Sequence, residues 1–158
     1  MLHVCPVQQA PAFIADSGLA DQGGWLAVDP HSLCHTEYAN IWGLGDVMNT
    51  TNAKTMAAVR KQVPVVAKNI ISVQAGQAPS AKYDGYGSCP LTVERGKIVL
   101  AEFCYGGRVA PSFPNWINAG TRPTRLAWWL KSLALPFVYW HLMLKGREWM
   151  THCPEEKT

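Results

Sequence analysis

The stretch Ile41-Trp42-Gly43-Leu44-Gly45-Asp46 decides the expected fold, because a short apolar run ends there in a glycine-bearing turn. Residues 49–52 are all Asn or Thr, the residue types that cap helix N-termini. Beyond them, apolar residues recur at steps of three and four, the spacing of one face of a helix: Met56, Val59, Val63, Val66 and Ile70. We therefore predict a buried strand, a turn and then a helix that ends near Gly76.

Further short strands are predicted on either side of this unit. Residues 24–29 leave a Gly-Gly turn and are typical of a short strand. Residues 91–93 and 98–105 flank Glu94-Arg95-Gly96-Lys97, a pattern that favours a β-hairpin. We therefore expect the α/β or α+β class, with units at residues 1–76, 77–121 and 122–150.

The composition excludes several classes of protein. Hydrophobic residues make up 48% of the 158 residues, which is enough for a packed core. The net charge of +3 is too small to indicate a nucleic-acid partner. The five cysteines are odd in number and include no C-x-x-C pair. We therefore expect neither a secreted disulfide framework nor a metal site.

Residues 126–144 form a mostly apolar stretch that is interrupted by Lys131, Pro136 and His141. These interruptions argue against a membrane span, and we expect Pro136 to divide the stretch into two short helices. The stretch also carries aromatic residues of the kind that gather at membrane surfaces: Trp128, Trp129, Tyr139 and Trp140. The pattern favours an amphipathic helical pair lying on a membrane, and the alternative is a helix buried against the domain.

The start of the predicted helix suits a ligand. Its free backbone N–H groups and positive dipole end favour an anionic or electron-rich group, and Asp46 just before it can accept from ligand hydroxyls. Lys54 in the first turn is unfavourable there unless it has a partner. The alternative is an ordinary connection in which Asp46 only caps.

Two segments resemble the second flavin-binding segment of the flavoproteins that contain two dinucleotide-binding domains. They are Gly23-Gly24-Trp25 through Val28-Asp29, and Tyr38-Ala39-Asn40 running into Ile41 to Asp46. The resemblance implies that Gly45 and Asp46 bind FAD. Ala53-Lys54-Thr55 resembles the lysine–threonine step of the same family, which implies that Lys54 and Thr55 also approach the flavin.

A more specific segment is Tyr83-Asp84-Gly85-Tyr86-Gly87-Ser88-Cys89-Pro90. It resembles the segment around the second redox cysteine of the sulfide:quinone oxidoreductases, particularly the mitochondrial type and its bacterial relatives. The resemblance implies that Cys89 is a redox-active thiol, with FAD as cofactor and sulfide and a quinone as substrates. It also implies a peripheral place on the mitochondrial or bacterial inner membrane. Candidates to line the quinone site are Phe103, Phe113 and Phe137. The resemblance leaves open whether the protein forms a homo-oligomer.

The resemblance also concerns what the chain lacks. In the family a first redox cysteine and a G-x-G-x-x-G fingerprint precede these motifs, so we expect a C-terminal portion that is inactive alone. One alternative is a relative of type II NADH:quinone oxidoreductase, which needs no thiol at Cys89. Another is an inactive fragment that only binds membranes.

Overall fold

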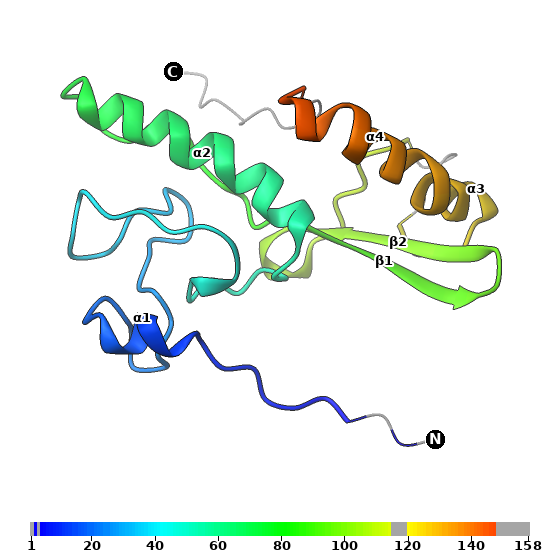
Figure 1. Ribbon diagram of the computed structural model, residues 1–158, viewed down its shortest axis with the longest axis horizontal. Coiled ribbons are helices and arrows are strands. Elements are labelled where there is room, and N and C mark those ends of the chain that lie inside the picture. Colours follow the sequence, from blue (N-terminus) through cyan, green and yellow to red (C-terminus); the bar gives the residue numbers. More distant parts are fainter. Residues whose placement is uncertain (1, 3, 115–119, 148–158) are drawn as a thin grey trace.

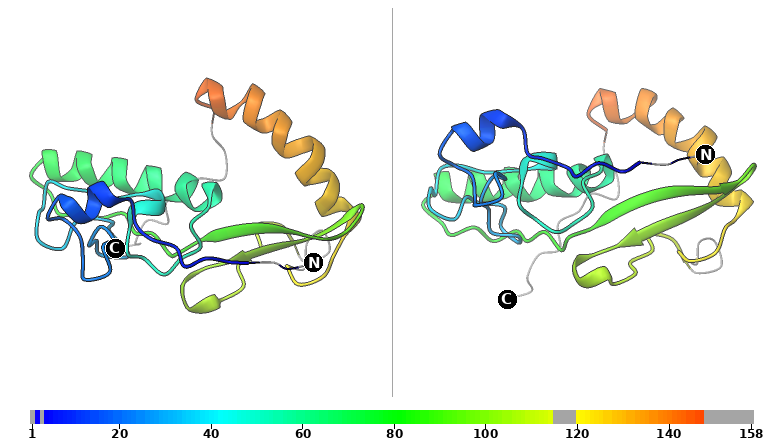
Figure 2. Two further views of the ribbon diagram at one scale, coloured as in Figure 1. Left: turned by 60° about the horizontal axis from the view of Figure 1, so that its bottom comes forward. Right: turned by 90° about the horizontal axis from the view of Figure 1, so that it is seen from below.

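The computed structural model describes residues 2, 4–114 and 120–147, which form short and long helices and one antiparallel hairpin, consistent with an α+β fold (Figure 1). The regular elements are α1 Ala12–Asp16, α2 Met56–Gln74, β1 Gly87–Glu94, β2 Lys97–Phe103, α3 Arg125–Trp129 and α4 Leu135–His141. The hairpin extends from the N-terminal end of α2, and the chain after it returns along the hairpin toward that end (Figures 1 and 2). The expected units 1–76, 77–121 and 122–150 stay a prediction, and residues 148–150 lie outside the described part.

The region before α2 folds without regular strands, so the strands expected at residues 24–29 and 41–46 were wrong. Single bridges hold it instead, including Leu26 with Met48 and Cys34 with Trp42. The turn itself is confirmed, because Gly45 has φ +76° and opens a 3-10 helix over Gly45–Val47. A chain that turns this often cannot continue a ladder, and its apolar side chains form a core from loops.

Helix α2 is confirmed, but its buried face is not the predicted one. The buried residues are Ala58, Gln62, Val65, Val66 and Asn69. Met56 and Val63 of the predicted apolar face are 65% and 46% exposed. The face is rotated because two polar side chains are buried, Gln62 and Asn69, each hydrogen-bonded to the backbone of another segment. Gly76, with φ +73°, follows the end of the helix as expected.

The hairpin is confirmed, and its first strand is longer than predicted. Glu94 pairs with Lys97 across the turn, where Gly96 has φ +82°. Strand β1 begins at Gly87, so Cys89 lies inside a strand, opposite Ala101. Alternation along the strands therefore decides which way each of these side chains faces.

The tail is one continuous helical rod, so the division expected at Pro136 was wrong. A π-helical segment, Leu130–Ala134, joins α3 to α4, and the flanking residues keep helical backbone angles. The N–H of Leu135 bonds to the carbonyl of Leu130, five residues back. This wider turn lets a helix pass a proline without breaking. We call residues 125–141 the tail helix.

Candidate functional site

The predicted flavin-binding residues gather at the N-terminal end of α2. The N–H of Gly45 donates to Oε1 of Gln62 at 2.8 Å, which fixes the turn against the helix. Asp46 follows in the 3-10 helix and is exposed. Thr55 is the N-cap of α2, where its Oγ1 accepts from the N–H of Ala58 at 3.3 Å. The structure therefore brings the Gly45-Asp46 turn and the Lys54-Thr55 step together at the N-terminal end of α2.

Lys54 has partners within the chain that sequence reasoning missed. Its Nζ donates to the carbonyl of Met48 at 2.8 Å and to that of Thr50 at 3.4 Å. It also lies 4.7 Å from the ring centroid of Trp25, a cation–π distance. Burial lowers the pKa of Lys54, and the carboxylate of Asp46 acts in the opposite direction. Among the described residues, the hydrogen-bond partners of this cation are therefore carbonyl oxygens.

A buried acceptor beside this helix start has no partner among the described residues. It is Oδ1 of Asn52, whose Nδ2 donates to the carbonyl of Ala53 at 2.9 Å. Buried polar atoms are almost always hydrogen-bonded, so an unpaired acceptor suits a ligand that carries a donor. Flavins carry an N–H and ribityl hydroxyl groups, and the residues present therefore fit such a group.

Cys89 lies close to the same place. A methyl group on Gly87 would come within 3.2 Å of Cβ of Ala53, so β1 starts against the residue just before Lys54. Cys89 is a free, partly exposed thiol two residues further on. By alternation it shares a hairpin face with Gly87 and with Phe103, the partner of Gly87.

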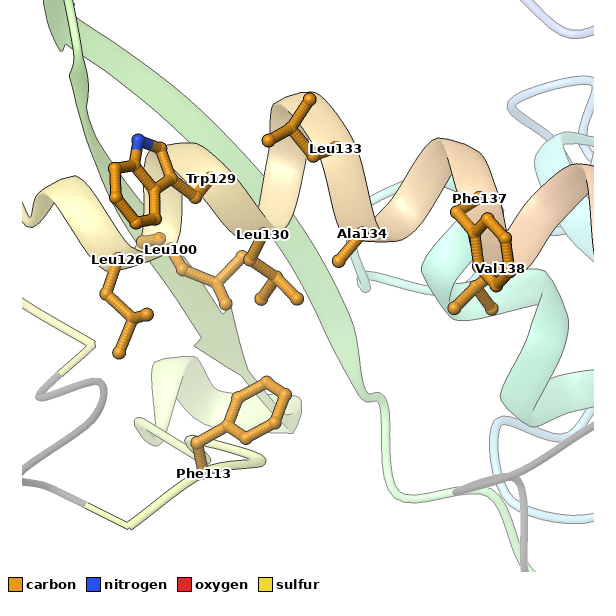
Figure 3. Close-up of a pocket in the computed structure, with 10 residues that line it drawn as sticks. Leu100, Phe113, Leu126, Trp129, Leu130, Leu133, Ala134, Phe137 and Val138 are labelled. Atoms are coloured by element: carbon orange, nitrogen blue, oxygen red, sulfur yellow. The ribbon is translucent and has the colours of Figure 1, made fainter.

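The opposite face of the hairpin forms an apolar cavity with the tail helix. Its volume is about 610 Å³, within the usual range for small-molecule sites. Figure 3 shows its side chains, which come from the hairpin, the loop after it and the tail helix. All of the lining residues are apolar: Leu100, Phe113, Leu126, Ala127, Trp129, Leu130, Leu133, Ala134, Phe137 and Val138. We call this the apolar cavity.

The predicted quinone and membrane residues divide among several places. Phe113, Phe137 and Trp129 line the apolar cavity, whereas Phe103 lies on the Cys89 face of the hairpin. Trp128 packs against the small core of Ile98, Leu100 and Ala127. Tyr139 lines a neighbouring cavity, and Trp140 is 62% exposed.

That neighbouring cavity is smaller, at about 290 Å³, and partly polar. We call it the polar cavity, and its walls come from the start of α2, the hairpin, the loop after it and the tail. Three of its side chains form a cluster in which Tyr86 and Ser112 donate to Glu102. Sequence reasoning missed it. The one signal was an acid at position 102, on the strand face that Ile98 and Leu100 bury.

Two searches of the described residues gave negative results. Within residues 2, 4–114 and 120–147 there is no helix that is both long and apolar enough to cross a membrane. The same residues contain no group of three or more His, Cys, Asp or Glu side chains that could hold a metal ion.

No protein-family model matches the chain. It is 38% identical to the mitochondrial sulfide:quinone oxidoreductase of Mus musculus, over 92% of this chain and 32% of that protein. Proteins of the same name from Schizosaccharomyces pombe and Dictyostelium discoideum are 37% and 40% identical, over 94% and 93% of this chain. The chain spans about a third of the length of these curated relatives.

Among solved structures, a chain in the cryo-EM structure of the Tetrahymena thermophila mitochondrial ATP synthase, an F1Fo composite tetramer, has a similar fold. It matches with a TM-score of 0.66 and 32% identity, over 82% of this chain and 31% of that chain. The curated relatives are by name oxidoreductases. The predicted resemblance is therefore confirmed, and the chain is related over nearly its whole length to the sulfide:quinone oxidoreductases.

Proposed function

We propose that the chain forms part of a flavoprotein that oxidises sulfide to sulfane sulfur and passes the electrons to a membrane quinone. The similarity to three curated proteins of that name, at 37–40% identity over nearly the whole chain, carries the proposal. In this reaction sulfide loses two electrons and a quinone gains two electrons and two protons. The residues that serve the reaction divide between the two faces of the hairpin.

On one face, Cys89 is the proposed redox-active thiol. Its thiolate is the reactive form toward sulfur. The strand that carries it begins beside Ala53, so the thiol is held near the residues proposed to bind the cofactor.

The proposed contacts of FAD are Gly45, Asp46, Lys54 and Thr55. The unpaired Oδ1 of Asn52 offers one more hydrogen-bond acceptor beside them. The flavin, when bound, supplies a two-electron carrier between sulfide and quinone. The protein's own contribution is a helix N-terminus whose dipole favours negative charge, with the Lys54 ammonium beside it.

On the other face, the apolar cavity is the proposed quinone site. A quinone with an apolar chain has to enter from a lipid phase, and the tail helix offers a way in. One stripe of its surface is exposed and apolar, with Trp129, Leu133, Phe137 and Trp140 each between 60% and 68% exposed. We propose that this exposed stripe lies on a membrane, which for a mitochondrial relative is the inner membrane.

A chimera tests the proposal directly. This chain replaces the matching third of the Mus musculus relative, and sulfide-dependent reduction of decylubiquinone is measured after FAD binding is verified by absorbance. We expect the chimera to reduce quinone and its Cys89→Ser variant to keep FAD but lose the reaction. The result that contradicts the proposal is a flavin-loaded chimera that oxidises NADH with quinone and is indifferent to Cys89→Ser, as a type II NADH:quinone oxidoreductase would be.

A further inference from the structure

The apolar cavity and the polar cavity are neighbours, because the same three side chains line both: Leu100, Phe113 and Leu130. The walls of the two cavities differ in chemistry. The first is lined only by apolar residues, whereas the second adds polar ones: Arg60, Lys61, Tyr86, Ser88, Glu102, Ser112 and Tyr139. Together they run from the middle of the tail helix to the start of α2. Such a site suits a molecule with an apolar chain and a head that forms hydrogen bonds.

The cluster at the polar end is built around one buried carboxylate. Glu102 is only 3% exposed. Its Oε1 accepts from the hydroxyl groups of Tyr86 and Ser112, both at 2.5 Å, and its Oε2 accepts from the N–H of Ser112 at 3.0 Å. Burial, and then the hydrogen bond to Glu102, raise the pKa of Tyr86 to about 12, so its phenol keeps its proton at neutral pH.

Tyr86 is the member of this cluster that can turn to a ligand at low cost. Ser112 contributes two donors to Glu102, one from its backbone and one from its hydroxyl. If the phenol of Tyr86 rotates its O–H toward a ligand, Glu102 therefore keeps a partner on each oxygen. A hydroxyl also both donates and accepts, which suits a ring oxygen that is a carbonyl before reduction and a hydroxyl after it.

We propose that the two cavities form one site for an amphiphilic quinone, with its ring oxygen on the Tyr86 hydroxyl and its apolar chain along the tail helix. This inference rests on the proposed function and adds the orientation of the substrate. The ring end lies beside Met56, Ala57, Arg60 and Lys61, in the first turns of the helix whose N-terminus is proposed to face the flavin. The apolar end lies against Leu133 and Trp129, which also belong to the exposed stripe.

Binding of three probes to the 158-residue chain in detergent micelles tests this orientation, with tryptophan fluorescence as the readout. Trp129 lines the apolar cavity and reports on its occupation. The probes are decylubiquinone, which has ring and chain, decylbenzene, which has the chain without ring oxygens, and duroquinone, which has the ring without a long chain. The variants are Tyr86→Phe, Leu133→Ser and, as a control that removes a phenolic hydroxyl outside both cavities, Tyr105→Phe.

We expect Tyr86→Phe to weaken decylubiquinone and duroquinone about three- to tenfold, the worth of one hydrogen bond, and to leave decylbenzene unchanged. Leu133→Ser should weaken the two probes with chains and spare duroquinone, and Tyr105→Phe should change none. Equal binding of decylubiquinone by wild type and Tyr86→Phe, or an equal loss of decylbenzene, overturns the orientation alone. Wild-type chain that binds decylbenzene but not decylubiquinone overturns the proposed quinone-linked function as well.

Discussion

The side chain of Asn69 and the backbone of Ala81 form a closed pair of hydrogen bonds. Nδ2 of Asn69 donates to the carbonyl of Ala81 at 3.0 Å, and the N–H of Ala81 donates to Oδ1 of Asn69 at 2.9 Å. The same Nδ2 donates to the carbonyl of Ser32 at 3.0 Å. One helical side chain thus ties α2 to the loop core and to the segment that returns toward Cys89.

Replacing Asn69 by Leu should lower the free energy of unfolding by about 2–4 kcal/mol. The residue is fully buried, and the apolar side chain leaves an N–H and two carbonyl groups without their partner. Urea denaturation followed by circular dichroism measures the change. Ala67→Leu, on an exposed position of the same helix, is the control and should stay within about 0.5 kcal/mol of wild type. Equal losses in both variants would contradict the role given to Asn69.

Replacing Thr55 by Ala should cost about 1 kcal/mol of stability, because the N–H of Ala58 loses its capping oxygen. Thr55→Ser keeps an oxygen in reach and should recover most of the loss. Thermal denaturation of the three chains measures both effects. If Thr55→Ser is as unstable as Thr55→Ala, the cap is not what stabilises the helix start.

The features that sequence predicted are those set by neighbouring residues. The existence of α2 follows from its apolar spacing and its end from Gly76, although its N-cap is Thr55 rather than one of residues 49–52. The hairpin follows from the glycine at position 96 between two apolar runs. Both signals lie within about 20 residues of chain, so no distant contact is needed to interpret them.

The features that sequence missed depend on distant partners. The buried side chain of Gln62 accepts a hydrogen bond from the N–H of Gly45, which lies 17 positions earlier in the chain. The spacing of apolar residues cannot reveal such a partner. The ammonium of Lys54 makes a cation–π contact with the ring of Trp25, which is distant in the sequence. The carboxylate of Glu102 accepts two hydrogen bonds from Ser112, which lies in the loop that follows β2. The predicted flavin-binding residues gather near one helix end, whereas the predicted quinone residues Phe103 and Phe113 lie on opposite faces of the hairpin.

Two partly buried tyrosines, Tyr86 and Tyr105, should ionise late in the folded chain. Burial raises the pKa of Tyr86 and of Tyr105 to about 12, helped by Glu102 for the first and by Asp29 and Asp84 for the second. The pKa of each phenol in the folded state lies above its unfolded-state value of about 10. The protonated phenols therefore make their full contribution to the free energy of unfolding below about pH 10. Their contribution is lost as the pH rises through about 12. Absorbance at 295 nm should therefore show a late phenolate step that shrinks in Tyr86→Phe. A titration complete near pH 10 while the chain is still folded would contradict the burial of these phenols.

The exposed stripe of the tail helix should bind lipid, and a charge on it should weaken that binding. Leu133 is 68% exposed at the centre of the stripe, and Leu133→Glu forces a carboxylate into any membrane contact the stripe makes. We expect about tenfold weaker binding to liposomes that contain anionic lipid, measured by co-sedimentation. The matched control is Ser132→Glu, which adds the same charge at the neighbouring exposed position, about a quarter turn away around the helix. Because both variants change the net charge equally, loss of general attraction to the anionic surface cancels between them. A selective loss in Leu133→Glu thus assigns the binding to the stripe, whereas equal losses would leave only electrostatic attraction and contradict the membrane role proposed for it.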